Sequence, residues 1–391
     1  MKKEKMSLRV KRPVHRSFSE GGSNPIKMLI LILIALGLCK FVFKDWSTTT
    51  PTETNGKPTV KIGATLPLTG ELAFAGIPAQ KAMEMALADL QKEQNLKYNY
   101  ELVFEDDAMD KKRAILNLNR MESINKISAI TTMWLMSSTI SPFANDKKII
   151  HMGCSWGKEP AKGLYNFNYS SFYEEQTALL IEEMQRRGVK KVGVISSNTL
   201  TDEEIVQYIK PELNKVGIET TFIVRVNPGT RDFKTEIAKM KQQPVDIVLL
   251  FMVSPENEIF AKQVKEQGYN VPLSTFDNFA YFPEFFEGQW FVRDAAENEE
   301  FTKRFEDVNS IRPESCSGHL YEGLKILVHG FEDAPTVEGK IPDNKDVAET
   351  ILNAKSLKSV LGNVYMDSDG NIHTEPSLRQ IKNGKIVPIE E

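Results

Sequence analysis

The chain has 391 residues, of which 41% are hydrophobic and 26% charged, a composition typical of a globular protein with two or three domains. The formal net charge is −4, and residues 1–27 hold eight Lys or Arg and two Glu, so the remainder carries about −10 (−4 minus +6). A mildly acidic globule of this kind argues against a nucleic-acid surface, which needs a basic patch.

The cysteines are too few and too far apart in the sequence to indicate a disulfide framework or a metal site. Of the three cysteines, Cys39 lies in an apolar N-terminal stretch. Cys154 and Cys316 alone make neither a disulfide framework nor a metal motif. His and Cys occur singly along the chain, so we expect no metal and no cofactor.

An apolar segment follows the basic tail of residues 1–27. Met28–Phe43 contains one charged residue, Lys40, and suits a short transmembrane helix or the apolar part of a signal peptide. Because positive residues precede it, the tail is expected to stay in the cytoplasm while the rest of the chain crosses. Leu36–Cys39 also resembles a lipoprotein cleavage box. For segment 28–44, an uncleaved anchor, a cleaved signal and a lipoprotein therefore remain open, and residues 45–58 form a flexible polar linker.

The soluble part opens with a strand, a loop and a helix. Val60–Ala64 is a short apolar run typical of a buried strand, and Gly70 and Gly76 lie in the loop that follows. In Pro78–Gln91, apolar residues recur at spacings of three and four, which indicates one apolar helical face. This is the opening unit of a parallel α/β domain, in which ligands bind outside the carboxyl ends of the strands. GxGxxG and GK[ST] are absent, so this is not a dinucleotide or phosphate loop.

The alternation of strands and helices then runs through two successive series. The first predicts strands at 100–104, 127–132, 148–152 and 165–169 and helices at 111–124 and 172–187. The second predicts strands at 191–196, 219–226, 245–252 and 271–276 and helices at 202–216, 232–242 and 255–267. Because the rhythm runs twice, we expect two similar α/β lobes rather than one large sheet. Helices at 297–308, 315–331 and 346–357 follow, and Asp369-Gly370 and Asn383-Gly384 predict two hairpins.

The order of these motifs is similar to that of a known family. VKIGATLPLTGELAFAG, an Ala-rich helix and LVFEDDAMD resemble the beginning of periplasmic leucine/isoleucine/valine-binding proteins. The resemblance continues through MSSTISP, the loop after KIIHMG, KVGVISS, RDFKTEIAKMK, VDIVLLFM and GNVYMDSDGNI, and covers about Thr59 to Ile389. Each motif is loose, but their order and spacing over this length are specific.

The resemblance implies a type I periplasmic-binding fold. Two Rossmann-like α/β lobes with parallel central sheets would be joined by three crossovers, near Asn168, Phe291 and Val364, with a ligand cleft between the lobes. Within the bilobal domain 59–391, lobe 1 would comprise about 59–167 and 293–363, and lobe 2 about 168–292 and 364–391.

The sequence also departs from the family pattern. Leucine-binding relatives carry a cysteine pair at the positions of Met109 and Met136, so we expect that disulfide to be absent and the two methionines to pack in the core. An aromatic residue expected just before Gly76 is Ala75 here, with Phe74 beside it. The tyrosine expected after VDIVLLFM corresponds to Val253.

The resemblance also implies how an amino acid would be held. Burying a ligand's carboxylate and ammonium requires partners for both charges. Ser137, at the start of a helix, and Ser155, after a strand, match the family's carboxylate-binding positions, where hydroxyls and helix N–H groups suit an anion. The Gly153 carbonyl matches an acceptor for the ammonium, and Asp277 matches the acid of lobe 2 that faces it.

Neighbouring residues complete the set of ligand-binding candidates: Ser138, Trp156, Phe74 and Ala75, with Trp134 as a further cleft-lining residue. Structural roles compete with each assignment. Ser137 would serve equally as a helix cap, and Asp277 as a cap for residues 278–281. Each Trp would serve equally in core or rim packing.

An enzymatic alternative rests on Gly153-Cys154-Ser155-Trp156-Gly157, which fits the G-x-S-x-G spacing of a nucleophile elbow after a strand. A hydrolase needs a helix directly afterwards, and Pro160 and Gly163 interrupt one. His319, His329 and His373 lie in no motif. We therefore expect no enzymatic activity.

Three functions remain as hypotheses. The first is the solute-binding component of an ABC-type amino-acid importer, which captures a small amino-acid-like or amide-like ligand and delivers it to a permease. The second is a membrane-tethered sensor that uses the same fold to recruit a signalling partner. The third is the hydrolase. The first two predict a periplasmic or cell-surface protein, held at the inner membrane by its N-terminal helix or secreted if that segment is cleaved, with no nucleic-acid partner.

Overall fold

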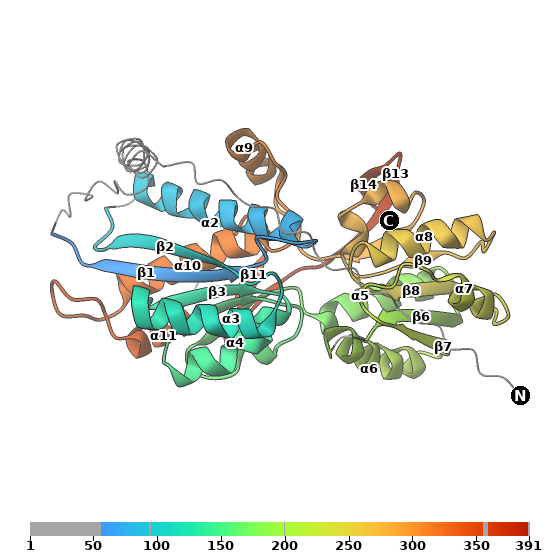
Figure 1. Cartoon of the computed structure of the whole chain (residues 1–391), viewed down its shortest axis with the longest axis horizontal. Helices are drawn as coiled ribbons and strands as arrows, with labels where there is room; N and C mark the ends of the chain where they lie inside the picture. The colour runs from blue at the N-terminus through green and yellow to red at the C-terminus, as the bar shows by residue number, and fades with distance from the viewer. Residues whose placement is uncertain (1–55, 94, 199, 355–358, 390–391) are drawn as a thin grey trace, which may run out of the picture. The chain divides into compact units, whose positions relative to one another are not determined.

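The computed structural model describes residues 56–93, 95–198, 200–354 and 359–389. The segment 28–44, for which the sequence predicts an anchor or a signal, lies outside these residues, as do the tail 1–27 and linker residues 45–55. None of the described helices combines the length and apolar character needed to cross a bilayer. Lys57–Glu391 forms one compact unit, which contains three sheets (Figure 1).

The largest sheet has seven strands in the order β11-β12-β5-β4-β3-β1-β2. Its strands are β1 (Thr59–Leu66), β2 (Asn99–Asp106), β3 (Ala129–Met133), β4 (Ile150–Cys154), β5 (Asn166–Ser170), β11 (Val364–Met366) and β12 (Asn371–Thr374). All neighbours pair in parallel except β11 and β12, which are antiparallel. We call this sheet and its helices lobe 1.

Helices cover both faces of the lobe 1 sheet. They are α2 (Ala73–Glu93), α3 (Lys111–Arg120), continued by a π-helical turn at Met121–Asn125, α4 (Leu135–Asp146), α10 (Ser317–Asp333) and α11 (Asn344–Leu352). Successive residues of β3 face opposite sides: Ala129 and Met133 pack in a core with α2, α10 and α11, whereas Ile130 packs in a second core with α3 and α4. This period of two is what a strand covered on both faces requires.

The second sheet has the order β7-β6-β8-β9. Its strands are β6 (Lys191–Ser197), β7 (Glu219–Val226), β8 (Ile247–Phe251) and β9 (Leu273–Ser274), and its helices are α5 (Tyr173–Arg186), α6 (Leu200–Lys215), α7 (Lys234–Met240) and α8 (Glu256–Glu266). Leu249 of β8 packs with α5 and α6, and Leu250 packs with α7 and α8. The two α/β series predicted from the sequence therefore form two separate parallel sheets.

A third, antiparallel sheet has the order β10-β13-β14. Its strands are β10 (Trp290–Arg293), β13 (Ser377–Lys382) and β14 (Lys385–Pro388). Phe291 of β10 packs in the core with α7 and α8, and Val292 packs in the core with α5 and α6. We call this sheet, the four-stranded sheet and their helices lobe 2. The helix α9 (Glu299–Asn309) and the 3-10 helices Glu159–Ala161, Asn278–Ala280 and Pro283–Phe285 complete the described elements.

The chain passes between the lobes three times, but the third passage differs from the sequence expectation. The first follows β5, which ends at Ser170, and the second follows β10, which ends at Arg293. The third was expected near Val364. Instead, β12 pairs in parallel with β5, so the hairpin β11–β12 belongs to the lobe 1 sheet and the chain leaves only after Thr374. The four residues of β12 are all buried, which explains why they complete that sheet.

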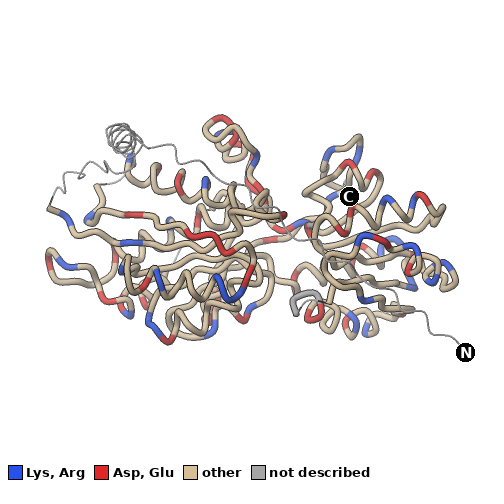
Figure 2. The backbone as a smooth tube through the Cα atoms, viewed as in Figure 1, with Lys and Arg blue, Asp and Glu red and all other residues tan. Residues whose placement is uncertain are grey.

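Both predicted hairpins form. In the second, Lys382 pairs with Lys385, and Asn383 and Gly384 have φ of 54° and 66°, as a two-residue turn with positive φ at both positions requires. The predicted methionine packing is also found, because Met136 is buried in the core with α3 and α4 and Met109 packs against that core. Along the described chain, Lys and Arg are interspersed with Asp and Glu in both lobes (Figure 2).

Candidate functional site

The candidate residues follow strand ends in both lobes. Phe74 follows β1, Ser137 follows β3 and Ser155 follows β4, all on the lobe 1 sheet. Asp277 follows β9 in lobe 2. Because the carboxyl ends of neighbouring parallel strands meet at one edge of a sheet, the fold brings the three lobe 1 residues to the same edge.

Ser137 is fully buried in the first turn of α4. Thr132 Oγ1 donates a hydrogen bond to Ser137 Oγ at 3.0 Å, so the Ser137 hydroxyl keeps its own proton for another acceptor. Gly153 packs against it: a Cβ at this position would lie 3.1 Å from Ser137 Oγ and 2.9 Å from Asn168 Oδ1. A side chain at 153 would therefore displace Ser137. The next residue, Ser138, is exposed.

Trp134 precedes α4 and has φ 53° and ψ −132°, a conformation that residues other than glycine seldom adopt. Its backbone N–H donates to the Cys154 carbonyl at 2.6 Å. Its indole Nε1–H donates to Ser315 Oγ at 3.2 Å. Strained residues of this kind cluster at ligand-binding sites. Trp134 thus links the start of α4 to the loop before α10.

Asn168 of β5 holds the backbone of Ser155. Asn168 Oδ1 accepts from the Ser155 N–H at 3.1 Å, and Asn168 Nδ2 donates to the Ser155 carbonyl at 2.9 Å. These bonds leave the hydroxyl as the group of Ser155 that can reach a ligand. After Ser155 the chain forms the 3-10 helix Glu159–Ala161, not the α-helix of a nucleophile elbow.

Phe74 and Ala75, both in the first turn of α2, lie in different surroundings. The Phe74 ring lies 5.2 Å from that of Tyr281 and 5.9 Å from that of Phe282, centroid to centroid, so Phe74 connects lobe 1 to lobe 2. Ala75 is fully buried in the lobe 1 core, so this candidate packs inside the lobe and not at a ligand surface. Val253, which takes the place of the family tyrosine, is 40% exposed.

Asp277 is buried in lobe 2, at 6% exposure. Arg293 Nε lies 3.9 Å from its Oδ1. Burial raises the pKa of Asp277 to about 6, although the charge of Arg293 acts against this rise. The Asp277 carbonyl accepts from the Ala280 N–H at 2.8 Å, so the backbone of Asp277 caps the 3-10 helix that follows.

Asp277 faces a small cavity between β10 and the start of α10. The cavity has a volume of about 20 Å³ and is lined by Asp277, Ala280, Tyr281, Arg293, Asp294, Ala295, Glu297, Glu314, Ser315, Cys316 and His319. This is room for about one water molecule. An amino acid is several times larger, so the side chains around this cavity must move before one can enter.

The charges around the cavity favour a cation. Asp277, Asp294, Glu297 and Glu314 face it, against the cations Arg293 and His319. Burial raises the pKa of Glu314 to about 7, and the nearby Asp277 adds to the rise while Arg312 opposes it. Sequence reasoning found Asp277 but missed the other acids. The sequence feature that could have indicated Asp294 and Glu297 is the charged run 293–297, directly after an apolar strand.

Asp294 joins all three passages between the lobes. Its Oδ1 accepts from Ser171 Oγ at 2.5 Å in the first passage and from Thr374 Oγ1 at 3.4 Å in the third. Its Oδ2 accepts from Trp156 Nε1 at 3.2 Å, so Trp156 lies at this junction rather than free in a cleft. His319 Nε2 lies 3.6 Å from Oδ1. Burial opposes the charge of Asp294, but His319 and the Ser171 bonds outweigh it and lower its pKa to about 2.

The structure corrects the cysteine analysis. Cys154 and Cys316 form a disulfide with a Cα–Cα distance of 6.0 Å. It joins the last residue of β4 to the residue that precedes α10. The two cysteines are 162 residues apart in sequence. Proximity over such a separation depends on the fold of both lobes, which explains why spacing gave no sign of it.

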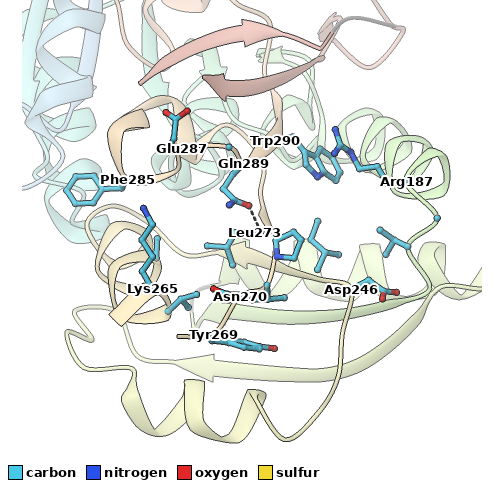
Figure 3. A pocket seen from close by; sticks show the side chains of 18 residues that line it. Arg187, Asp246, Lys265, Tyr269, Asn270, Leu273, Phe285, Glu287, Gln289 and Trp290 are labelled. Carbon is cyan, nitrogen blue, oxygen red and sulfur yellow. Dashed lines mark hydrogen bonds between the residues drawn. The ribbon is translucent and has the colours of Figure 1, made fainter. Parts of the chain in front are cut away.

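A further hollow lies elsewhere in lobe 2, at the starts of β8 and β9 and not at their ends. It has a volume of about 720 Å³. Figure 3 shows Gln289 bonded to the backbone of Leu273, at 2.7 Å. Glu287 accepts from Asn383 N and Gly384 N, and the Arg187 guanidinium lies 4.9 Å from the centre of the Trp290 ring. The hollow lies away from the carboxyl ends of the strands, where ligands of parallel α/β sheets bind, so it is not the candidate site.

Comparisons with known proteins agree on one family. The family described as periplasmic binding protein matches residues 59–385. The Leu/Ile/Val-binding protein homolog 2 of Brucella abortus (strain 2308) is 23% identical over 343 residues, covering 81% of this chain and 88% of its own length.

Solved structures show the same fold. The branched-chain amino acid transporter substrate-binding protein LivJ from Streptococcus pneumoniae, in complex with isoleucine, has a TM-score of 0.74 at 16% identity, covering 84% of this chain and 97% of its own. An ABC transporter solute-binding protein from R. palustris, in complex with benzoate, has a TM-score of 0.75 at 18% identity, covering 84% and 95%. With the family match spanning residues 59–385, the chain belongs to the periplasmic binding protein family.

Proposed function

We propose that this protein is an extracytoplasmic solute-binding protein that captures a small amino-acid-like ligand between lobes 1 and 2 and passes it to an ABC-type importer. The observation that carries the proposal is the pairing of a donor site in lobe 1 with an acidic site in lobe 2. Ser137 Oγ accepts from Thr132 in the first turn of α4, which leaves its hydroxyl able to donate, and Asp277 faces a cavity rich in carboxyl groups.

The two sites suit the two charges of an amino acid. The Ser137 hydroxyl and the N-terminus of α4 favour a carboxylate. Asp277, supported by Glu314, favours an ammonium. The Ser155 hydroxyl is a second donor beside the Cys154–Cys316 disulfide. Family relatives support this assignment, because a neighbour of the same fold was solved with isoleucine. A ligand held by both lobes favours the closed arrangement, in which both sets of contacts are available.

A thermal-shift panel of amino acids, amides and small carboxylates tests the ligand class. A ligand at 100 times its dissociation constant stabilises the fold by about 2.7 kcal/mol. The amino-acid assignment fails if none of the panel raises the melting temperature, and an aromatic acid that does so alone would place this chain beside the benzoate-binding neighbour.

Two substitutions then test the site by calorimetric titration. Asp277→Asn removes the counter-charge of a buried ammonium and should weaken binding by about 3–5 kcal/mol. Ser137→Ala removes one donor and should cost about 1–2 kcal/mol. Ser138→Ala alters an exposed neighbour and should cost less than Ser137→Ala. Equal effects of the two serine substitutions would remove Ser137 from the site.

We also propose that Met28–Phe43 anchors the protein to the inner membrane, with the bilobal domain on the periplasmic side. The support is the apolar composition of the segment and the basic tail before it. Mass spectrometry of membrane and soluble fractions tests the anchor. Peptides that begin near Lys40, recovered from the soluble fraction, would contradict it.

A further inference from the structure

A groove lies between the start of α2 in lobe 1 and α8 in lobe 2. It has a volume of about 510 Å³ and is lined by Glu71, Phe74, Ser254, Pro255, Glu258, Ile259, Lys262, Phe282 and Phe285. This size falls within the range of small-molecule sites. Phe74 apart, none of these residues belongs to the candidate cleft described above.

The walls of the groove are mainly apolar. Phe74 and Phe282 face each other from the two lobes with ring centroids 5.9 Å apart. Phe285 is 41% exposed. An aromatic or aliphatic body placed here would remove apolar surface of both lobes from water, which is favourable in proportion to the area covered.

Glu258 brings a buried carboxyl group to this apolar surface. It is 5% exposed, and its Oε1 accepts from Ser254 Oγ at 3.1 Å. Its Oε2 is buried and has no hydrogen-bond partner among the described residues. Burial raises the pKa of Glu258, and the nearby carboxylates of Glu256 and Glu284 add to the rise. A buried polar oxygen without a partner is costly and calls for an explanation.

The position of Glu258 at the start of α8 does not explain why its Oε2 is buried without a partner. Acidic residues in the first turn of a helix are favoured by its dipole, and Glu256 and Glu258 both lie there. Glu256 obtains partners, because its Oε1 accepts from the Gly229 N–H at 2.6 Å and lies 3.3 Å from Arg231 NH1. Among the described residues, no Lys or Arg forms an ion pair with Glu258. Lys262, one turn later, is exposed, and its Nζ lies 3.9 Å from Glu266 Oε1.

We propose that this groove is a binding site, separate from the amino-acid cleft, for a small molecule with an ammonium group on an aromatic or aliphatic body. The ammonium group pairs with Glu258 Oε2 and the body lies against Phe74, Phe282 and Phe285. An ammonium supplies what Glu258 Oε2 lacks, namely a hydrogen-bond donor and a positive charge. A carboxylate beside Glu258 Oε2 is disfavoured, because the two like charges repel each other.

Calorimetric titration with phenethylamine tests the site at pH 8, where the Glu258 carboxyl is more fully ionised. 3-Phenylpropanoate and 2-phenylethanol are matched probes with the same ring and a negative or neutral end. The variants are Glu258→Gln and Glu284→Gln, because Glu284 is an exposed acid beside the same carboxyl. Circular dichroism of each variant checks that it folds.

We expect phenethylamine to bind the wild type at least tenfold more tightly than either matched probe. Glu258→Gln should weaken it at least tenfold, and Glu284→Gln should weaken it less than threefold. Equal affinity of wild type and Glu258→Gln overturns the proposal, as does absence of measurable phenethylamine binding to the wild type.

The amino-acid cleft provides the remaining control. If Asp277→Asn abolishes phenethylamine binding while Glu258→Gln does not, the amine enters the cleft, and the groove proposal fails while the proposed function stands. If no amino acid binds but phenethylamine binding is lost in Glu258→Gln, the proposed function fails and the groove proposal stands.

Discussion

Arg231 NH2 of lobe 2 lies 3.2 Å from Glu71 Oε1 of lobe 1, just before α2. Arg231 NH1 also lies 3.3 Å from Glu256 Oε1 at the start of α8. One guanidinium group therefore links a carboxylate of each lobe. Arg231 is 43% exposed and Glu71 71%, so this contact is an accessible ion pair of modest strength.

Removing this link should weaken ligand binding slightly. Exposed ion pairs contribute about 0–1 kcal/mol, so Arg231→Gln should lower the affinity of any cleft ligand by about two- to fivefold. The loss should shrink at high salt, because ions screen exposed charges. Titrations at low and high salt measure both effects. Arg225→Gln is the matched control, because Arg225 pairs with Glu203 inside lobe 2. An equal loss in both variants would rule out a role in closure.

Binding of an ammonium ligand should strengthen as the pH rises from 5 to 8. The carboxyl of Asp277, with its pKa raised to about 6 by burial, and that of Glu314, with a pKa of about 7, bind an ammonium in their ionised forms. One group with a pKa of about 6 is roughly one tenth ionised at pH 5, so it alone should weaken binding about tenfold there. Calorimetry across this range tests the trend, which should become shallower in Asp277→Asn, where Glu314 still titrates.

The carboxyl groups of Asp277 and Glu314 should make the folded protein less stable as the pH rises, whereas they make ligand binding tighter. A carboxyl whose pKa is raised in the folded state favours folding below its unfolded pKa, and this contribution is lost as the pH rises through the folded value. For Asp277 the window runs from about pH 4 to 6. Urea unfolding of wild type and Asp277→Asn should show a difference that changes across this window. A constant difference would contradict the raised pKa.

Asp294→Asn should destabilise the fold more than other substitutions at the site. It leaves His319 buried without its counter-charge, and breaking such a pair costs about 3–5 kcal/mol. The pKa of Asp294 is lowered to about 2, so its contribution is present above about pH 4 and disappears as the pH falls toward 2. Urea unfolding at pH 3 and pH 7 measures this. Glu297→Gln keeps an acceptor for Gly318 N and should cost far less.

The Cys154–Cys316 disulfide should contribute strongly to stability. The bond spans 162 residues, and the chain-entropy relation gives about 5 kcal/mol for a loop of this length. The double variant Cys154→Ala/Cys316→Ala should therefore unfold at lower urea concentration than the oxidised wild type. Thiol titration of the denatured, unreduced chain should find one free thiol, that of Cys39. Three free thiols would contradict the bond.

Local patterns were sufficient to predict most of the fold. The apolar run of β8 and the turn residues Asn383-Gly384 each specify a short segment without help from the rest of the chain. Pro211 illustrates a limit, since a proline in a helix interior favours a break or a kink, yet it lies inside the continuous helix α6. The crossover expected near Val364 was wrong because the pairing of β12 with β5 joins segments about 200 residues apart, and local sequence does not encode such pairing.

The candidate site was less predictable for the same reason. Ser137 and Asp277 could be proposed because each follows a recognisable strand. Arg293, Glu314 and His319 meet Asp277 around one cavity, and no short motif contains all of them. Their proximity arises where β10 and α10 approach, which depends on the second passage between the lobes. Ala75 was assigned to the ligand because it occupies the position just before Gly76 where the resemblance implies an aromatic residue. A helix turns neighbouring side chains to different faces, and Ala75 faces the core.

The disulfide also defines how the two lobes are connected covalently. The four-stranded sheet of lobe 2 and its helices α5 to α8 lie within the stretch between Cys154 and Cys316. Lobe 2, apart from β13 and β14, is therefore a ring whose two ends are fastened to lobe 1. A protease that cuts once in this ring, for example in the loop between β7 and α7, releases no fragment. The nicked protein would run as one species on a non-reducing gel and as two after reduction.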